Sequence, residues 1–218
     1  RLVYFRKQMN QNNSNQFEFT NNWFDTTAKS IWENLLPKFK PVKVLEIGAY
    51  EGASTCFLIK SLSSHLDKFE IHSVDTWDGG KEHKDSKIDM SLVESRFHKN
   101  TSIQKSKSEK DVNLVIHKSS SINALCKLIS ESKSGYFDFI YIDGSHMALD
   151  VITDAVLSFE LVKIGGIIAF DDYLWRLPGS NSILTNPKFA IDSFTNIFSS
   201  RIRILGGPNH QQYIQKIS

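Results

Sequence analysis

Short apolar runs alternate with helical patterns along most of the chain. The apolar runs have the length of buried strands, which we expect at 42–47, 69–75, 113–117, 137–143 and 167–172. Between them, apolar residues recur at every third or fourth position, which predicts helices at 53–65, 89–100, 121–133 and 147–162. Polar stretches at 76–88 and 104–111 are expected to be loops, with a turn at Gly165 and Gly166. Strands that alternate with helices form a parallel sheet covered on both faces, so the pattern predicts an α/β, Rossmann-like fold.

Both ends of the chain depart from this alternation. Residues 1–20 contain the polar tract MNQNNSNQ, which cannot bury a core, so we expect a flexible arm at 1–20 and one domain at 21–218. A helix at 21–38 is expected to end at Pro37 and to cover one face of the sheet. Alternatively, this helix could form a lid over a ligand, with Trp23 at its tip. Asn186 and Pro187 predict another helix start. RIRILG and QQYIQK, separated by GPNH, then predict a terminal antiparallel hairpin and a seven-stranded sheet.

Composition narrows the class of protein further. The 218 residues are 40% hydrophobic and include 15 Phe, enough for a full core, and the net charge of +2 requires neither nucleic acid nor an acidic membrane as partner. No apolar run approaches about 18 residues, so we expect no transmembrane helix. Cys56 and Cys126 both fall in helical patterns, which indicates core residues rather than a disulfide. We expect a cytoplasmic protein, although the chain begins at Arg1 and a segment upstream stays open.

The stretch VKVLEIGAYEGAST at 42–55 combines a strand, a glycine turn and a helix start. Glycine lets the backbone approach a ligand closely, and the helix start offers free N–H groups. Tyr50 stands where the dinucleotide pattern G-x-G-x-x-G needs its second glycine. Glu46 and Glu51 would repel a pyrophosphate but tolerate a ligand that carries an amino group and a sulfonium. Asp75 ends the next strand, at the distance where an acid typically binds ribose hydroxyls.

The pattern E-x-G-x-x-x-G followed by Asp75 resembles motif I of the class I S-adenosylmethionine (SAM) methyltransferases. The stretch YIDGSHMALDVITDAVLSFELVKIGGIIAFDDYLW resembles a bacterial family of small-molecule O-methyltransferases, with the order and spacing of the catechol O-methyltransferase group. The resemblance implies a cofactor site for SAM. Its residues would be Glu46 at the amino group, Gly48, Ala49, Gly52 and Ser54 along the methionine part, Asp75 and Thr76 at the ribose, Trp77, Lys118 and Ser119 at the adenine, and Asp143.

The same resemblance implies a metal site. In that fold the fourth and fifth strands are neighbours, so Asp143, Asp171 and Asp172 would converge, and their like charges call for a divalent cation such as Mg²⁺. As the alternative, Asp143 or Asp171 caps a helix or turn. The family places its general base, a Lys, where this chain has His146; a histidine suits base work near neutral pH but also commonly packs or caps. We therefore expect His146 and Asp143 to be catalytic.

Three functions remain open at this point. The first is metal-assisted O-methylation of a small acceptor whose hydroxyl lies beside another oxygen, as in a catechol or a vicinal diol. The second is a nicotinamide-dependent oxidoreductase, which Tyr50 and the terminal hairpin disfavour. The third is a catalytically silent binding domain, which the polar groups at all five strand ends disfavour. We expect no nucleic-acid or membrane partner, and association with a second copy of the chain stays open.

Overall fold

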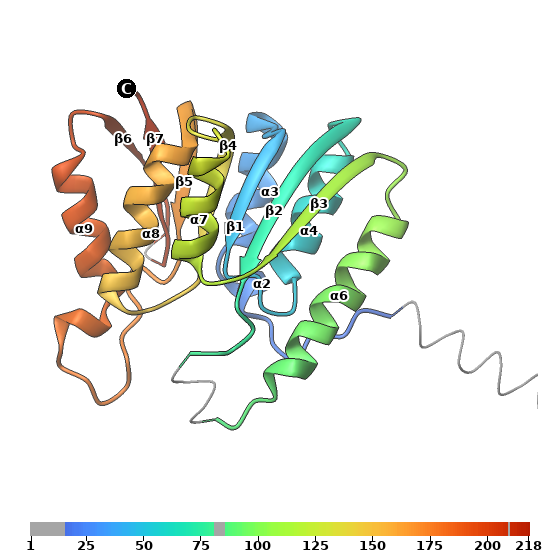
Figure 1. Ribbon diagram of the computed structural model, residues 1–218, viewed down its shortest axis with the longest axis horizontal. Helices are drawn as coiled ribbons and strands as arrows, with labels where there is room; N and C mark the ends of the chain where they lie inside the picture. Colours follow the sequence, from blue (N-terminus) through green and yellow to red (C-terminus); the bar gives the residue numbers. More distant parts are fainter. Residues whose placement is uncertain (1–15, 81–85, 209) are drawn as a thin grey trace, which may run out of the picture.

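The computed structural model describes residues 16–80, 86–208 and 210–218, and its strands form one sheet (Figure 1). The strands are β1 Lys43–Ile47, β2 Lys68–Asp75, β3 Asp111–Lys118, β4 Phe137–Ile142, β5 Val162–Phe170, β6 Ile202–Leu205 and β7 Gln212–Lys216. They lie in the order β3-β2-β1-β4-β5-β7-β6. The first five are parallel, and β7 runs antiparallel to both β5 and β6. The predicted Rossmann-like sheet of seven strands, closed by an antiparallel hairpin, is confirmed.

Helices cover both faces of the sheet (Figure 1). One face carries α7 Ser121–Ser130, α8 Ala148–Leu161 and α9 Pro187–Ile197, and the other carries α3 Lys29–Phe39 and α4 Ala53–Ser63. The remaining helices are α2 Trp23–Thr26, α6 Met90–Ser106 and the 3₁₀ turn η1 Ile183–Thr185. Successive strand residues point to opposite faces, so Leu45 and Ile47 pack towards α7 and α8, while Val44 packs towards α3 and α4. No described helix has the length and apolar character needed to cross a membrane.

Several element boundaries differ from the expectation. The first helix is divided into α2 and α3, and α3 continues past Pro37 to Phe39. Helix α6 continues to Ser106, into the stretch expected to be a loop. Strand β5 starts at Val162 directly after α8, so the glycine pair lies inside the strand. A side chain at Gly166 would lie 2.9 Å from the backbone oxygen of Asp138 on β4, so the glycine serves a close strand approach rather than a turn.

The buried stripe of α8 also differs from the expectation. Val156 was expected to face the core but is 44% exposed, whereas Asp154 and Ser158 are buried. Polar residues thus occupy part of the helix face that packs against the sheet. The thiols of both cysteines are free, as expected, but Cys126 is exposed, so its assignment to the core was wrong.

The described residues just before α2 are hydrogen-bonded to the rest of the domain. The backbone N–H of Glu18 donates to the side-chain oxygen of Asn100 at 2.8 Å, and the N–H of Thr20 donates to Glu51 at 2.7 Å. Arg96 donates to the same Glu51 carboxylate at 3.0 Å. Residues 18–20 therefore belong to the folded unit, and the boundary expected at residue 20 lies too late. The part of the expected arm at 1–15 falls outside the described residues.

Candidate functional site

A cavity of about 460 Å³ opens at the carboxyl ends of β1 and β2, the lower edge of the sheet in Figure 1. It extends from the glycine turn to the starts of α7 and α8. Four residues expected to bind the cofactor line it, namely Gly48, Asp75, Thr76 and Ser119. Open parallel sheets bind their ligands at this edge. The cavity is thus the candidate ligand site.

Gly48 is required by the close approach of β1 and β4. Its φ angle is +87°, and a Cβ added there would lie 2.1 Å from the backbone oxygen of Asp143. The strands come this close because the N–H of Asp143 donates to the carbonyl of Ile47 at 2.8 Å. Any side chain at position 48 would push the two strand ends apart, so the glycine keeps the cavity floor in place.

Asp75 holds two strained backbone positions at the cavity. Its Oδ2 accepts from the N–H groups of Ala49 and Tyr50, each at 2.9 Å, and its Oδ1 accepts from the N–H of Trp77 at 2.8 Å. Tyr50 and Trp77 have φ angles of +46° and +51°, which side-chain-bearing residues rarely adopt. A carboxylate offers about four acceptor positions, so one remains for a ligand hydroxyl. Asp75 therefore shapes the glycine turn and also faces the cavity.

Glu46 does not face the cavity. It is fully buried and accepts hydrogen bonds from the hydroxyls of Ser54, Thr55 and Ser73. Burial raises the pKa of Glu46, and the three hydroxyls oppose this shift. Because Glu46 lies on the α4 side of β1, its carboxylate fastens the first turn of α4 to the sheet. Glu46 thus supports the start of α4, together with Ser54, and its expected contact with the cofactor's amino group stays a prediction.

Two further expected residues also lie away from the cavity lining. The Trp77 ring is 4% exposed and packs 5.0 Å from the ring of Phe97, and its indole N–H donates to the carbonyl of Tyr50 at 2.9 Å. The Trp77 side chain is thus packed as a buried hydrophobic residue. Lys118 is exposed and forms an ion pair with Glu94 at 2.7 Å. Neither Trp77 nor Lys118 lines the cavity, and their expected contacts with adenine stay predictions.

Beside the cavity, carboxylates gather at the ends of β4 and β5. The Tyr141 hydroxyl contacts Asp143 Oδ2 at 3.1 Å and also contacts Asp171 Oδ2. A hydroxyl carries one proton, so it can donate to only one of these carboxylates at a time. The side chain of Gln211, which precedes β7, donates to Asp171 at 3.1 Å.

The like charges of this cluster change its acidity. Burial raises the pKa of Asp171, and the neighbouring Asp172 raises it further. Surrounding protein atoms reduce the solvation of the Asp143 carboxylate, and Asp171 and Asp172 repel its charge. Both effects raise the pKa of Asp143 well above its usual range. Asp143 is exposed at the end of β4, where the charges of Asp171 and Asp172 act on it. Among the described residues, no Lys or Arg forms an ion pair with these carboxylates.

His146 lies next to the third carboxylate. Its Nε2 is 2.8 Å from Asp172 Oδ2, and its ring stacks on Trp175 with centroids 3.9 Å apart. Asp172 has a φ angle of +55°, a conformation that is costly for a residue with a side chain. Strain of this kind is concentrated at functional sites. The structure therefore pairs the two residues expected to act as base and metal ligand.

The expected metal ligands converge only in part. Asp143 and Asp171 meet at Tyr141, whereas Asp172 faces His146. In the part of the chain that the structure describes, no three His, Cys, Asp or Glu side chains are arranged to hold a metal ion. Consecutive residues at the end of a strand point in different directions, which separates Asp171 from Asp172.

Sequence reasoning missed several residues at this edge. Tyr141 could have been found, because it lies two residues before Asp143 and so shares its face of β4. No sequence pattern indicated Trp175 or Gln211, because a loop and a distant segment of the chain bring them to the site. Asp154 lines the cavity but was hidden in an apolar helical pattern.

Comparisons with known proteins agree with this geometry. The family model described as "Methyltransferase domain" matches residues 45–173. The protein named "Probable caffeoyl-CoA O-methyltransferase 3" of Dictyostelium discoideum is 29% identical over 151 residues, which cover 69% of this chain and 51% of that protein. The chain thus spans about half the length of that relative. A caffeoyl-CoA O-methyltransferase of Stellaria longipes is 25% identical over 184 residues, covering 81% of this chain and 67% of that protein.

Solved structures share the fold. The O-methyltransferase of Bacillus cereus, solved in complex with SAH, aligns with a TM-score of 0.58 and 17% identity over 87% of this chain and 80% of that one. The O-methyltransferase TomG of Streptomyces achromogenes, solved in complex with SAM, aligns with a TM-score of 0.60 and 12% identity over 88% and 80%. The family model covers more than half of the chain, from β1 to the residues after β5. The chain therefore belongs to the methyltransferase domain family.

Proposed function

We propose that the protein transfers a methyl group from SAM to a hydroxyl group of a small acceptor. The observation that carries this proposal is the position of the cavity. It runs from the glycine turn past Asp75 and reaches Gly144 and Ser145, the two residues that follow Asp143 at the end of β4. A cofactor in the cavity and an acceptor at the carboxylates would then be neighbours. Membership of the methyltransferase domain family and the two caffeoyl-CoA O-methyltransferase relatives support the same reaction.

The cofactor would lie along the residues that line the cavity. Gly48 would let the backbone approach the methionine part, Asp75 and Thr76 would meet the ribose, and Ser119 would meet the adenine. Ala49, Gly52, Ser54 and Glu46 would stand behind them and hold the turn. This arrangement divides the expected residues into a ligand-contacting layer and a supporting layer.

A divalent cation fits the donor chemistry of the carboxylate cluster. The chemistry it would supply, held by Asp143 and Asp171 with Asp172 beside them, is to lower the pKa of the acceptor hydroxyl and fix its orientation. Carboxylate oxygens are the ligands that Mg²⁺ prefers, and the like charges here have no Lys or Arg ion pair among the described residues. Asp172 would keep Oδ2 on His146 and offer its other oxygen to the site.

His146 is the candidate general base. With Asp172 at its Nε2, the imidazole would accept the proton of the acceptor hydroxyl. The stacked ring of Trp175 would keep the imidazole in one orientation during this transfer. Asp172 would also stabilise the imidazolium that forms.

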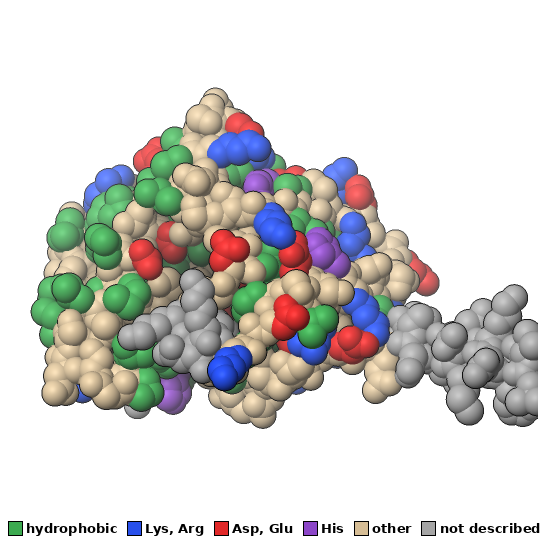
Figure 2. All heavy atoms as spheres, turned by 60° about the horizontal axis from the view of Figure 1, so that its bottom comes forward, with side chains coloured by type: hydrophobic (Ala, Val, Ile, Leu, Met, Phe, Trp, Pro, Cys, Tyr) green, Lys and Arg blue, Asp and Glu red, His purple; other side chains and the backbone are tan. Residues whose placement is uncertain are grey.

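The acceptor would enter from the segment that follows β5. Leu174, Ile183 and Leu184 in this segment are exposed, at 43%, 57% and 58%. Figure 2 brings the carboxyl edge forward and shows hydrophobic side chains gathered on its left. An acceptor with a flat apolar body and two neighbouring oxygens, as in a catechol, fits this combination.

We also retain the predictions of a cytoplasmic location and of no nucleic-acid or membrane partner.

Calorimetry followed by a transfer assay tests the proposal. SAM and its demethylated product SAH should bind with one site per chain, and NAD should not bind. Radiolabelled SAM should then methylate at least one member of a panel of catechols and vicinal diols. Binding of NAD in place of SAH would favour the oxidoreductase alternative. SAH binding without transfer to any hydroxyl acceptor would favour a silent binding domain.

A further inference from the structure

Asp154 is an acid that the proposed chemistry does not use. It lies on α8 with 2% of its surface exposed, and its Oδ1 has no hydrogen-bond partner among the described residues. Buried carboxylates are costly unless they are paired, so such an oxygen calls for a donor that the protein itself does not provide. Asp154 also lines the cavity, together with Ser119, Ser120 and Ser121 at the start of α7.

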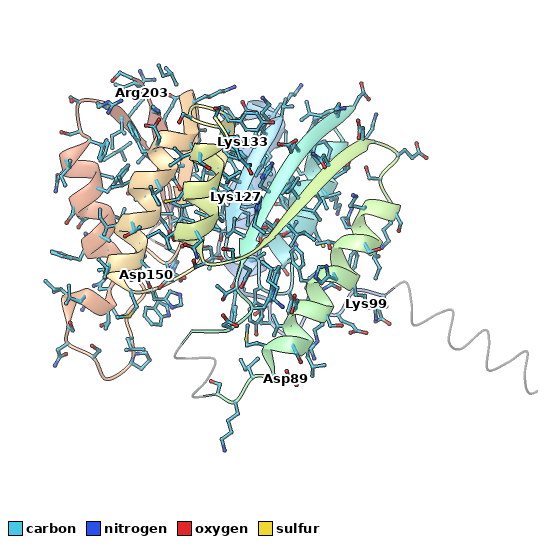
Figure 3. The ribbon with its side chains drawn as sticks, in the orientation of Figure 1. Asp89, Lys99, Lys127, Lys133, Asp150 and Arg203 are labelled. Carbon is cyan, nitrogen blue, oxygen red and sulfur yellow. The ribbon has the colours of Figure 1, made fainter. Side chains whose placement is uncertain are left out.

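The charge state of Asp154 suits an acceptor role. Burial raises its pKa to about 6, Asp150 adds to this shift, and the Ser121 hydroxyl opposes it. The carboxylate is therefore mostly ionised above neutral pH. Figure 3 shows the neighbouring Asp150 at the start of α8, on the same edge of the molecule as the strand ends. Asp154 follows Asp150 by one helical turn and lines the same cavity.

The position of the cavity limits what could reach Asp154. Gly48 and Asp75 lie at one end, where the methionine part and the ribose would be bound. The base is attached to the ribose, so it would extend towards α7 and α8. In adenine the exocyclic amino group is the only hydrogen-bond donor, because the ring nitrogens N1, N3 and N7 are acceptors. A carboxylate can only accept, so it selects that amino group.

We propose that Asp154 is a specificity residue that accepts a hydrogen bond from the 6-amino group of the cofactor's adenine. This inference rests on the proposed cofactor but not on the metal or on the acceptor. Helix α8 contributes two carboxylates to the cavity lining, Asp150 and Asp154, and of these two Asp154 is the buried one.

The test compares two ligands by calorimetry. The first is SAH, and the second is its analogue with hydrogen in place of the 6-amino group. Hydrogen bonds to charged groups correspond to a loss of roughly tenfold to a hundredfold in affinity, and the wild-type protein should show that preference for SAH. Asp154→Leu, which is similar in size and cannot accept, should bind both ligands within about threefold of each other. Asp154→Asn should fall between the two.

Ser158→Ala is the matched control. Ser158 is buried on the same face of α8, its hydroxyl has no partner among the described residues, and it does not line the cavity. This variant should keep the wild-type preference. Equal binding of the two ligands to the wild-type protein would overturn the inference without any variant, as would an unchanged preference in Asp154→Leu. If SAH itself does not bind, the proposed cofactor fails and this inference fails with it.

Discussion

Two polar clusters in this molecule have similar residues but opposite organisation. The first joins Asp143 and Asp171 through the Tyr141 hydroxyl at the carboxyl ends of β4 and β5. The second lies on β2 and β3, where His72 contacts His117 at 2.8 Å and Glu70 at 2.7 Å. Both contain titratable groups at hydrogen-bond distance. Of the two, the first lies beside the cavity, whose lining includes Gly144, and next to Asp172, a residue with a strained backbone.

The second cluster balances its own charges. Burial alone would raise the pKa of Glu70, but hydrogen bonds from His72 and from its other neighbours lower it. Tyr136 donates to Glu70 at 2.9 Å, and the ammonium of Lys133 lies 3.9 Å from the same carboxylate. Figure 3 labels Lys133 close to this part of the sheet. Each hydrogen-bond acceptor of the second cluster thus has a donor within the protein.

The first cluster does not balance its charges among the described residues. Burial and the charge of neighbouring carboxylates raise the pKa of Asp143 and of Asp171, and the basic side chain that pairs with this group is His146, at Asp172. Among the described residues, these acids thus lack the Lys or Arg ion pairs that would offset their charge, which is the feature behind the proposed cation site. Unbalanced charge beside a cavity, rather than a high density of polar groups, therefore distinguishes a candidate functional site from a structural cluster in this molecule.

Substitutions of one carboxylate in each cluster should separate the two roles most strongly. Asp171→Asn should lower methyl transfer by at least about 100-fold, because it removes a proposed ligand of the cation. Glu70→Gln should leave transfer within about threefold of wild type and lower the free energy of unfolding by about 1 kcal/mol, because it weakens hydrogen bonds far from the cavity. Steady-state kinetics and urea denaturation measure the two effects. Equal losses of activity in both variants would remove the distinction between the clusters.

A smaller effect is expected at the cofactor end of the cavity. Asp75→Ala should weaken SAH binding roughly tenfold to a hundredfold, because it removes a charged acceptor and releases the N–H groups of Ala49 and Tyr50. Asp111→Asn is the control, since Asp111 is an exposed carboxylate paired with Lys68 at 2.9 Å. Calorimetry should find that only Asp75→Ala changes the affinity. Unchanged affinity in Asp75→Ala would contradict the assignment of the ribose site.

The smallest effect concerns pH and the second cluster. Burial lowers the pKa of His72 and His117 below the ordinary value of 6.5. Below pH 6.5 the unfolded chain therefore binds more protons than the folded one, so the free energy of unfolding should fall as pH falls. Each extra proton contributes a slope of at most about 1.4 kcal/mol per pH unit.

His117→Gln tests this pH dependence. The variant should show a shallower loss of stability between pH 7.5 and pH 5.5 than wild type, measured by urea denaturation at both values. The difference between the two proteins isolates the histidine, because the carboxylates of the first cluster are common to both. Parallel slopes would mean that His117 does not contribute to the pH dependence.

Much of the fold could be predicted because each strand and helix is encoded locally. The strand ends were readable in the sequence, and so was the meeting of acids after β4 and β5. The directions of side chains were less well predicted. Residues alternate between faces along a strand, so Glu46 had to share the α3 and α4 side of the sheet with Val44, away from the cavity lined by Ile47.

Other features could not be read because they depend on distant parts of the chain. The contact between Gln211 and Asp171 joins residues 40 positions apart. The strained backbone of Asp172, which turns its side chain towards His146, has no local sequence signature. Asp154 was overlooked because apolar neighbours completed the helical pattern around it.

Titration of Mg²⁺ or Mn²⁺ into the protein at pH 7.5, followed by calorimetry, tests for a cation site at the ends of β4 and β5. The account predicts one divalent cation per chain in the wild-type protein and in Glu70→Gln, and none in Asp171→Asn. Bound cation should also raise the melting temperature, because it binds only the folded state. Absence of binding to the wild-type protein, or undiminished binding to Asp171→Asn, would contradict the claim that the carboxylates at the ends of β4 and β5 form a cation site.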